Sequence, residues 1–530
     1  MAAGIFEAYV AGRAAAFFPS HFASRDDRRR AVERAARPLA REVADALEAQ
    51  NASLTPSAAR RAQLVALRRG AAAVVTGQQM GLFLGPLFTI YKAATAIRAA
   101  RALSAESGQP VVPVFWLQNE DHDLPEIATC HLPGAYGPLA LQVPGSPADR
   151  VPVAHRALPD DLTTCLATLG VRLAHLRHAG AHIDRLAQHY RPGRSWSDAF
   201  AGVLAGLFED LVLLDPRDPA IATAAAPVHR RAIAEAEPIA DALVARGRRL
   251  EDAGFAPTVH VRPGAPLSFF HPDGAQGPRY RLRPAGDGYA LVGRDEHHTS
   301  DELLAALAAE PLRFSNSALL RPILQDTLLP TAAYVGGPAE VAYFAQLPPL
   351  YAAYDLAMPL IVPRVRLRVV EGRTARLLAR LGLSPEEACR ADAERLAAAR
   401  ADPADSAALE RRVRAPFAAA LDAVRAEMEP LPAGVGVAFD KTRSTVEEAL
   451  AKLGGKIELA RLHASQETVT AVRHVRDMLW PNDTPQERLY GLAYFAARYG
   501  ERAFLERVLD AAEPFAARAG DLVLTDEAVS

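Results

Sequence analysis

The stretch that decides the fold is VVTGQQMGLFLGPLFTIYK, at residues 74–92. It begins with the β-branched residues of a buried strand, continues through a turn that contains Gly77, Gly81 and Gly85, and ends in a helical pattern. A strand that leads through glycines into a helix places backbone N–H groups at the carboxyl end of the strand, where phosphate or carboxylate binds. The stretch therefore predicts an α/β fold with a ligand site at this turn. The alternative is a tight turn that binds nothing.

A second hydrophobic strand follows the first helix. Residues 72–76 and 111–117 are apolar runs on either side of a helical segment at residues 86–103. Two such strands joined by a helix predict a βαβ unit with parallel strands. We expect helices before residue 70, a further strand at residues 211–214, and hairpins over residues 258–292.

Polar side chains accompany the glycines of the turn. Thr76, Gln78 and Gln79 add hydroxyl and amide groups that turning alone does not require, so we expect the segment from Thr76 to Gly85 to bind a nucleotide or substrate. The turn matches neither a P-loop nor the GxGxxG fingerprint. Lys92 is the only lysine in the first 440 residues, and we expect its compact charge to neutralise a phosphate or carboxylate. The alternative is a surface lysine with a packed stem.

Four ionisable residues follow the second strand and are the predicted catalytic group: Glu120, Asp121, His122 and Asp123. They lie where open α/β sheets place chemistry. In an extended chain, Glu120 and His122 share one side and the two aspartates share the other. A histidine flanked by carboxylates can act as a general base toward an amine, and spare carboxylates can hold a Mg²⁺ that arrives with phosphates. A capping or salt-bridge cluster is the alternative. No zinc site is predicted, because no second His or Cys lies at ligand spacing.

Further polar residues gather over positions 315–343. There Arg321 can grip a carboxylate bidentately, and a Gly-Gly-Pro turn precedes a helix that carries Glu340 and Tyr343 one turn apart. The additional residues expected to contact nucleotide or substrate are Asn119, Asn316, Arg321, Gln325, Gly336, Gly337, Glu340 and Tyr343. A structural role is the alternative for each.

Composition limits the kind of protein. At roughly 150 residues per domain, the 530 residues correspond to three or four units, and the net charge of -2 provides no broad field for nucleic acid or anionic membrane. No run approaches the roughly 18 apolar residues of a membrane span, and no signal peptide is expected. The three cysteines are too few and too scattered for a disulfide framework or a zinc cluster. We therefore expect a cytoplasmic protein with buried, reduced thiols.

The last third of the chain has a coiled-coil texture. Apolar residues recur at helical and coiled-coil steps over 409–428 and 446–460, and Pro430 to Gly436 separates the two runs. This pattern predicts an antiparallel helical hairpin whose apolar stripe favours a homodimer. The tail after Trp480 is predicted to be helical and to pack on the core.

Four motifs in matching order closely resemble those of one known family, the bacillithiol-biosynthesis cysteine-adding enzymes (BshC family). The motifs are TGQQMGLFLGPLFTIYKAATAI from residue 76, VPVFWLQNEDHDLPEI from 112, RPILQDTLLPTAAYVGGPAEVAYFAQL from 321, and WPNDTPQER from 480. Together they span nearly the whole chain, which makes the resemblance more specific than any short pattern.

The resemblance implies a Rossmann-like core, related to class I synthetases and HIGH-motif nucleotidyltransferases, with a helical insert and an α-helical coiled-coil insert associated with dimerisation. The boundaries it implies are 1–148 and 193–368 for the core, 149–192 for the helical insert, 369–478 for the coiled coil, and 479–530 for a C-terminal helical segment on the core.

The resemblance also implies an activity. It is the addition of L-cysteine to the amino group of glucosaminyl-malate, which forms bacillithiol in the last step of its biosynthesis. Forming an amide in water normally requires coupling to ATP, which brings Mg²⁺ with it. Gln78 and Gln79 stand where HIGH enzymes have histidines, and no convincing KMSKS-like loop is present. The ATP-handling residues of those relatives therefore do not transfer.

We expect ATP or activated cysteine over the Thr76 to Gly85 turn, with Lys92 balancing its charge. His122, oriented by Asp121 or Asp123, would take the proton of the attacking amine. The malate carboxylates would be held by Arg321, or by Arg364 and Arg366. The alternatives are a HIGH-class nucleotidyltransferase that acts on another small substrate, and a nucleotide-binding scaffold whose coiled coil recruits a partner.

Overall fold

A five-stranded parallel sheet forms the centre of the computed structural model, which describes residues 4–135, 137–144, 149–390, 403–427, 433–463, 466–517 and 519–524. The strands are β1 (Ala72–Gln78), β2 (Val111–Leu117), β5 (Val212–Leu214), β11 (Thr331–Gly336) and β12 (Leu360–Pro363). Their spatial order is β12-β11-β1-β2-β5. Counted along the chain this order is 3-2-1-4-5, which is the Rossmann arrangement. The predicted α/β, Rossmann-like fold is confirmed.

The βαβ unit that opens the sheet forms where the hydrophobic runs predict it. β1 and β2 pair in parallel over seven residues, from Ala72 opposite Val111 to Gln78 opposite Leu117. Helix α5 (Phe88–Ser107) connects them and ends at Gly108, whose φ of 70° is the left-handed conformation that glycine adopts readily at a helix end. Three of the seven residues in each strand are β-branched, and nearly all residues of both strands are buried because both faces of a parallel sheet are covered.

Helices cover both faces of this sheet. Along β2, Trp116 packs with one core cluster, which includes residues of α10 (Pro219–Ala234) and α13 (Arg321–Leu328). Phe115 points to the other face, where it packs with α5 and with Phe200 of α9 (Trp196–Leu207). This alternation places the loops that follow each strand at one common edge.

Other helices precede the coiled coil along the chain, and the last two of them, α16 and α17, pack with α21 (Gln466–Leu479) in a separate small core. These other helices are α1 (Ile5–Val10), α2 (Arg25–Ala35), α3 (Arg41–Ala52), α4 (Ala58–Arg68), α6 (Leu124–Ile127), α7 (Leu162–Leu173), α8 (Ala179–His189), α11 (Ala236–Asp252), α12 (Ser300–Ala309), α14 (Pro338–Phe344), α15 (Pro348–Ala353), α16 (Gly372–Leu381) and α17 (Pro385–Arg390). The helices predicted before residue 70 and in the insert near residues 150–190 are present.

A second sheet is antiparallel and confirms the predicted hairpins. Its order is β10-β6-β7-β8-β9. The strands are β6 (Ser268–Phe270), β7 (Tyr280–Ala285), β8 (Gly288–Leu291), β9 (His297–Thr299) and β10 (Phe314–Asn316). Phe270 and Leu282 pack against Leu303 of α12 in a separate small core. A two-stranded pair, β3 (Thr129–Gly134) with β4 (Gly137–Gln142), follows β2 along the chain.

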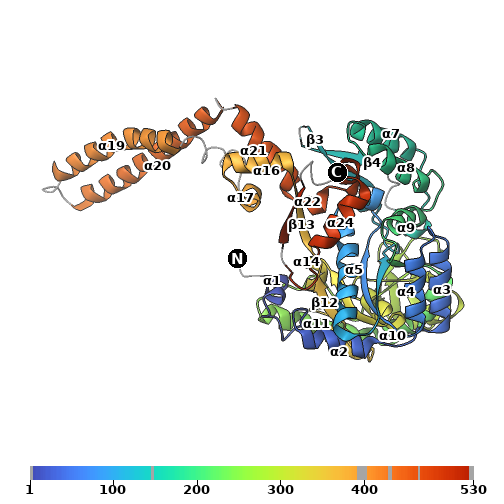
Figure 1. Cartoon of the computed structure of the whole chain (residues 1–530). Helices are drawn as coiled ribbons and strands as arrows, with labels where there is room; N and C mark the ends of the chain where they lie inside the picture. The colour runs from blue at the N-terminus through green and yellow to red at the C-terminus, as the bar shows by residue number, and fades with distance from the viewer. Residues whose placement is uncertain are drawn as a thin grey trace.

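The predicted helical hairpin is present as α19 (Pro403–Glu427) and α20 (Ala433–His463). Arg425 pairs with Asp440 at 3.4 Å, and Arg443 pairs with Asp422 at 3.2 Å, which is an antiparallel register. The expected turn from Pro430 to Gly436 lies partly outside the described residues, as does Met428. Figure 1 shows the hairpin projecting away from the rest of the molecule.

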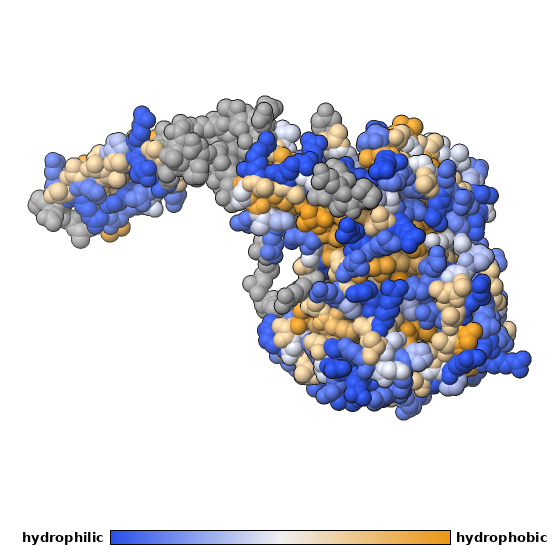
Figure 2. All heavy atoms as spheres, viewed as in Figure 1, coloured by the Kyte–Doolittle hydropathy of each residue, from blue (hydrophilic) through white to orange (hydrophobic). Residues whose placement is uncertain are grey.

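Large apolar side chains remain exposed on the hairpin. Phe417 is 51% exposed and Val437 is 72% exposed, and Val424 and Leu453 are also exposed. Figure 2 shows apolar and charged residues interspersed on the visible face of this projection. Two helices alone therefore leave part of the predicted stripe uncovered.

The tail after Trp480 is only partly as predicted. α21 (Gln466–Leu479) leads to α22 (Gln486–Leu489), α23 (Leu492–Tyr499) and α24 (Glu501–Ala511), and the chain then forms strand β14 (Ala519–Leu524). β14 pairs in parallel with β13 (Arg366–Glu371). The prediction of an entirely helical tail is wrong, because this strand depends on a partner about 150 residues away, which local sequence does not reveal.

The cysteines and the helix lengths bear on the expectations drawn from composition. Cys130, Cys165 and Cys389 are buried and unbridged, as predicted. Among the described residues, no helix combines the length and apolar character that crossing a bilayer requires.

Candidate active site

The strand order creates a topological switch point between β1 and β11. In open α/β sheets, ligands bind in the crevice outside the carboxyl ends of the strands at such a point. A cavity of about 270 Å³ lies there, between Gln78 and Gln79 after β1 and Gly337 and Glu340 after β11. We call it the switch-point cavity.

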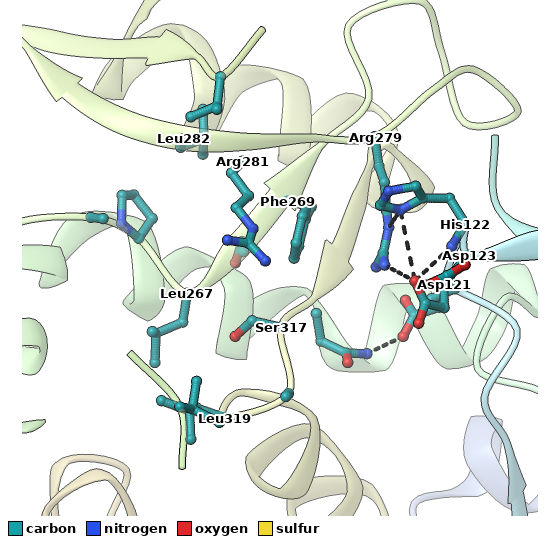
Figure 3. A pocket seen from close by; sticks show the side chains of 18 of the residues that line it. Asp121, His122, Asp123, Leu267, Phe269, Arg279, Arg281, Leu282, Ser317 and Leu319 are labelled. Atoms are coloured by element: carbon teal, nitrogen blue, oxygen red, sulfur yellow. Dashed lines mark hydrogen bonds and ion pairs between the residues drawn. The ribbon is translucent and has the colours of Figure 1, made fainter. Parts of the chain in front are cut away.

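A larger cavity of about 770 Å³ lies beside it, outside the carboxyl end of β2. Gln118 and Ala318 line both cavities, so the two adjoin. The segment from Glu120 to Asp123 forms one side of the large cavity, and the antiparallel sheet forms another (Figure 3). Adjoining cavities of different size suit a reaction that brings two ligands together.

Glu120 is buried in the wall of the large cavity. Asn316 donates a hydrogen bond from Nδ2 to its carboxylate, which brings together two residues that were predicted separately. Burial raises the pKa of Glu120 to about 7, although Arg217 and Arg279 oppose the shift. A carboxylate that titrates near neutral pH in a cavity has the proton affinity of a general base.

Asp121 and His122 meet at the guanidinium of Arg279 (Figure 3). The Nε of Arg279 donates to Nδ1 of His122 at 2.8 Å, and its NH2 donates to Asp121. Asp121 also accepts from Nε2 of Gln79 at 2.7 Å, so the turn after β1 touches the segment after β2. The predicted convergence of these two strand ends is present.

The predicted orientation of His122 by a carboxylate is wrong. Asp121 lies 3.7 Å from Nδ1 of His122, and Arg279 donates to that nitrogen instead. Since arginine only donates, Nδ1 is an acceptor and the proton of the neutral ring lies on Nε2. Burial and Arg279 lower the pKa of His122. Because the lone pair of Nδ1 is already occupied by Arg279, the neutral ring of His122 can donate a hydrogen bond from Nε2 but is poorly placed to act as a base.

The predicted alternation of these four side chains is also wrong, because the chain leaves the extended conformation after β2. Asp121 and His122 face the same guanidinium rather than opposite sides. Asp123 caps the short helix α6 by accepting a hydrogen bond from the N–H of Glu126 at 3.3 Å. For Asp123 the structure therefore supports the alternative prediction of a capping role.

Lys92 lines the switch-point cavity but its charge is already balanced. Its Nζ pairs with Glu340 and donates to the carbonyl of Gly77 at 2.7 Å and to Oε1 of Gln78 at 3.0 Å. These contacts use all three N–H donors of the ammonium. Lys92 therefore holds the ends of β1 and β11 together, and its expected role as the counter-charge of a ligand is not supported.

The arginines expected to hold malate are also engaged. Arg321 is fully buried and donates to Gln325 at 2.9 Å and to the hydroxyl of Tyr343 at 3.0 Å. Arg364 forms a bidentate pair with Glu487 at 2.8 Å, although its Nε has no hydrogen-bond partner among the described residues. The third, Arg366, lies over the ring of Phe6 and lines neither cavity. Paired guanidinium groups of this kind are poor candidates for a second carboxylate.

Two of the predicted turn residues serve packing. A Cβ on Gly81 would lie 2.6 Å from the Cα of Gly85, so these glycines permit a close approach of backbone to backbone. Residues 82–84 between them form a buried single turn, and the carbonyl of Tyr490 accepts from the N–H of Leu87 at the start of α5. The expectation that Gly81, Gly85 and this helix N-terminus contact a ligand is therefore not supported.

Replacing Gly81 tests that packing role. We expect Gly81→Ala to lower the free energy of unfolding by about 1–3 kcal/mol, because backbone rather than a flexible side chain would have to move. Gly180→Ala is the matched control, since that glycine lies in a helix with open space around it. Denaturant titration measures both, and equal stability of the two variants would contradict the packing role.

Other predicted residues hold the sheet together. Thr76 donates to the carbonyl of Val335 at 2.9 Å, which joins β1 to β11. Asn119 donates to Asp215 at 2.7 Å and joins the ends of β2 and β5. A Cβ on Gly77 would lie 2.8 Å from the carbonyl of Trp116. Gly336 likewise lies close to the side chain of Glu340. These contacts support the structural alternative for each residue.

The structure adds site residues that the sequence did not single out. Arg279, Arg281 and Phe269 come from the antiparallel sheet and line the large cavity. The region was recognised as hairpins, but nothing in its pattern indicates that it faces the β2 segment about 150 residues earlier. The only sequence signal for this part of the site was the occurrence of arginines next to aromatic residues in the hairpin region.

The lining of the switch-point cavity decides whether a nucleotide with its metal fits there. Four cationic side chains (Lys92, Arg321, Arg364 and Arg488) and two acidic ones (Glu126 and Glu340) line the switch-point cavity. Glu340 balances Lys92 and Glu487 balances Arg364, so Arg488 is the cationic residue of this lining that suits a phosphate group. The described residues contain no group of three His, Cys, Asp or Glu placed to bind a metal, so a Mg²⁺ there would need ligands from phosphate.

Comparison with known proteins places the chain in a family. Residues 3–365 match the family model described as "Bacillithiol biosynthesis BshC, N-terminal Rossmann-like domain", and residues 367–519 match "Bacillithiol biosynthesis BshC, C-terminal coiled-coil domain". A protein of Koribacter versatilis named "Putative cysteine ligase BshC" is 38% identical, with 86% of this chain and 85% of the relative covered. A protein of Salinibacter ruber with the same name is 34% identical, with 91% and 89% covered. The chain therefore belongs to the BshC family of bacillithiol biosynthesis.

Proposed function

We propose that this protein is an ATP-dependent ligase that forms an amide bond between the carboxyl group of L-cysteine and the amino group of glucosaminyl-malate. Membership of the family and the names of its relatives support cysteine as one substrate. The observation that carries the proposal is Glu120, a buried carboxylate with a pKa of about 7 in a cavity that adjoins a second, cationic one.

The two cavities divide the reactants between them in this proposal. The switch-point cavity holds the phosphates of the nucleotide near Arg488, and the large cavity holds the amino sugar. ATP, when bound, supplies the phosphoryl chemistry that makes the cysteine carboxyl group electrophilic. Gln118, which lines both cavities, marks the place where the two reactants meet.

Glu120 acts as the general base. The amine nitrogen attacks the activated carbonyl carbon, the C–N bond forms, and the phosphate-bearing group leaves with the electron pair of the broken C–O bond. The proton of the nitrogen passes to the carboxylate of Glu120, which has the affinity to accept it near neutral pH. The Nε2–H of His122, held in place by Arg279, is available to donate to substrate oxygen.

Reconstitution tests this function. Purified protein with ATP, L-cysteine and glucosaminyl-malate is expected to yield a new thiol with the mass of bacillithiol, together with AMP or ADP, detected by mass spectrometry. Nucleotide turnover on another small substrate without that thiol would favour a HIGH-class nucleotidyltransferase. Ligand binding without turnover, together with a stable protein partner, would favour a scaffold.

We further propose that the hairpin pairs with a second copy of this chain. The exposed Phe417 and Val437 support this arrangement, because projecting apolar residues are commonly covered by a partner. Phe417→Glu/Val437→Glu is expected to shift the protein from dimer to monomer in sedimentation equilibrium. Val171→Glu, at an exposed valine on α7, is the control and is expected to leave the dimer intact. A monomeric wild type, or a dimeric double variant, would contradict the pairing.

A further inference from the structure

Two arginines of the large cavity differ in what they contact. Arg279 and Arg281 are two residues apart on one face of the β7 segment, and both lie over the ring of Phe269, at 4.4 Å and 5.7 Å. Arg279 is buried and bound to Asp121 and His122. Arg281 is exposed and lines the cavity, and its side chain has no hydrogen bond or ion pair with any described residue.

The position of Arg281 suits a carboxylate. A guanidinium that lies over an aromatic face is held by the ring while its N–H edge stays free for a bidentate contact. Arg279 places a second positive charge on the same ring. Asp121 pairs with Arg279, but no carboxylate among the described residues pairs with Arg281. The two positive charges repel each other. An anion that binds Arg281 would reduce this repulsion without displacing an existing partner of the Arg281 side chain.

Charge is also distributed unevenly across the cavity. The acids lie at the β2 side, where Glu120 is the proposed base, and Arg281 lies on the other side of Phe269 from Asp121 and His122 (Figure 3). A second exposed arginine, Arg262, also lines the cavity, and its guanidinium has no hydrogen bond or ion pair among the described residues. A ligand with an amine at one end and carboxylates at the other matches this polarity.

We infer that Arg281 is the residue that binds the carboxylates of the acceptor substrate and thereby directs its amine toward Glu120. The inference rests on the proposed function, since it assigns one end of the acceptor to each side of the cavity. It also makes Arg281 a specificity residue, because acceptors without carboxylates gain nothing from it. This role replaces the one expected for Arg321, Arg364 and Arg366.

Steady-state kinetics of Arg281→Met with two acceptors test the inference. With glucosaminyl-malate, we expect KM for the acceptor to rise about 10- to 100-fold, as loss of a charge-assisted contact predicts, while KM for ATP is unchanged. With methyl glucosaminide, which has no carboxylate, we expect wild type and variant to be equally active. Arg283→Met, on the same strand but outside the cavity, is the matched control and is expected to behave as wild type.

The inference is overturned if Arg281→Met keeps the wild-type KM for glucosaminyl-malate, or if only its KM for ATP rises. Calorimetric binding of glucosaminyl-malate, measured without ATP or cysteine, separates this result from a failure of the proposed function. If the wild type forms no thiol but still binds the acceptor 10- to 100-fold more tightly than the variant, the carboxylate site stands and the proposed reaction does not. Equal binding by wild type and variant refutes the site.

Discussion

Glu120→Gln is expected to reduce kcat for thiol formation by about 10²- to 10⁴-fold, the usual contribution of a positioned general base. The amide is nearly isosteric and can still accept the hydrogen bond from Asn316, so the cavity should keep its shape. What the variant loses is the capacity to take a proton. Turnover of cysteine and glucosaminyl-malate measured under saturating ATP gives the effect.

The pH dependence provides a second, sharper readout of the same variant. Because burial raises the pKa of Glu120 to about 7, the carboxylate is the base only above that pH, and wild-type kcat should rise through about 7. Glu120→Gln should lose that rise. Glu42→Gln, at an exposed glutamate on α3, should keep both the rate and the profile. A Glu120→Gln enzyme with wild-type kcat and the same rise would remove Glu120 from the chemistry.

Lys92→Met is expected to lower the free energy of unfolding by about 3 kcal/mol, because it leaves the carboxylate of Glu340 without its cation in the wall of the switch-point cavity. The substitution also removes the donors to Gly77 and Gln78 at the end of β1. Denaturant unfolding of the purified variant measures the loss.

A double-mutant cycle separates the ion pair from general packing. Lys92→Met/Glu340→Gln should be less destabilised than the sum of the single variants, since the amide leaves no buried charge unpaired. Arg231→Met removes a surface pair with Asp355 and should cost less than about 1 kcal/mol. Additive losses at Lys92 and Glu340 would contradict a coupled buried pair.

Strands β1, β2 and β5 of the central sheet were predictable because their signal is local, whereas β11 and β12 lie in a stretch that was expected to form loops and short helices. The apolar run at residues 111–117 is the observed β2, residue for residue, and the run from Ala72 became β1. The sequence correctly predicted that the glycines after β1 form a turn. It did not predict that Gly81 and Gly85 pack against each other. Gly81 could face either a ligand or Gly85. The outcome depends on how the turn packs against α9 and Tyr490, and local sequence does not reveal these tertiary contacts.

The place of the ionisable cluster was predictable from the sequence, but the contacts of its side chains were not. The cluster from Glu120 to Asp123 does line a cavity, but the base that the geometry favours is Glu120 instead of His122. The difference comes from Arg279, which arrives from another sheet and occupies Nδ1 of the ring. A neighbour that is distant in the chain changes both the tautomer and the pKa, and no local pattern encodes it.

Lys92 is a second residue whose partner could not be predicted from local sequence. Its isolation among 440 residues predicted a place where a compact positive charge matters. The sequence did not show that Glu340 would meet it, because the two residues come together only when β1 and β11 pair in the sheet. Two charges that were each predicted to contact a ligand instead contact one another.

In the proposed reaction, ATP activates the carboxyl group of cysteine, and the amine of the acceptor then captures the activated carboxyl group. Cysteine labelled with oxygen-18 in its carboxylate tests this most directly, with the label followed by mass spectrometry. We predict that each bacillithiol formed is accompanied by one labelled oxygen in AMP or in phosphate. Bacillithiol that forms without transfer of label, or label-free nucleotide products and no bacillithiol at all, would contradict the proposed reaction.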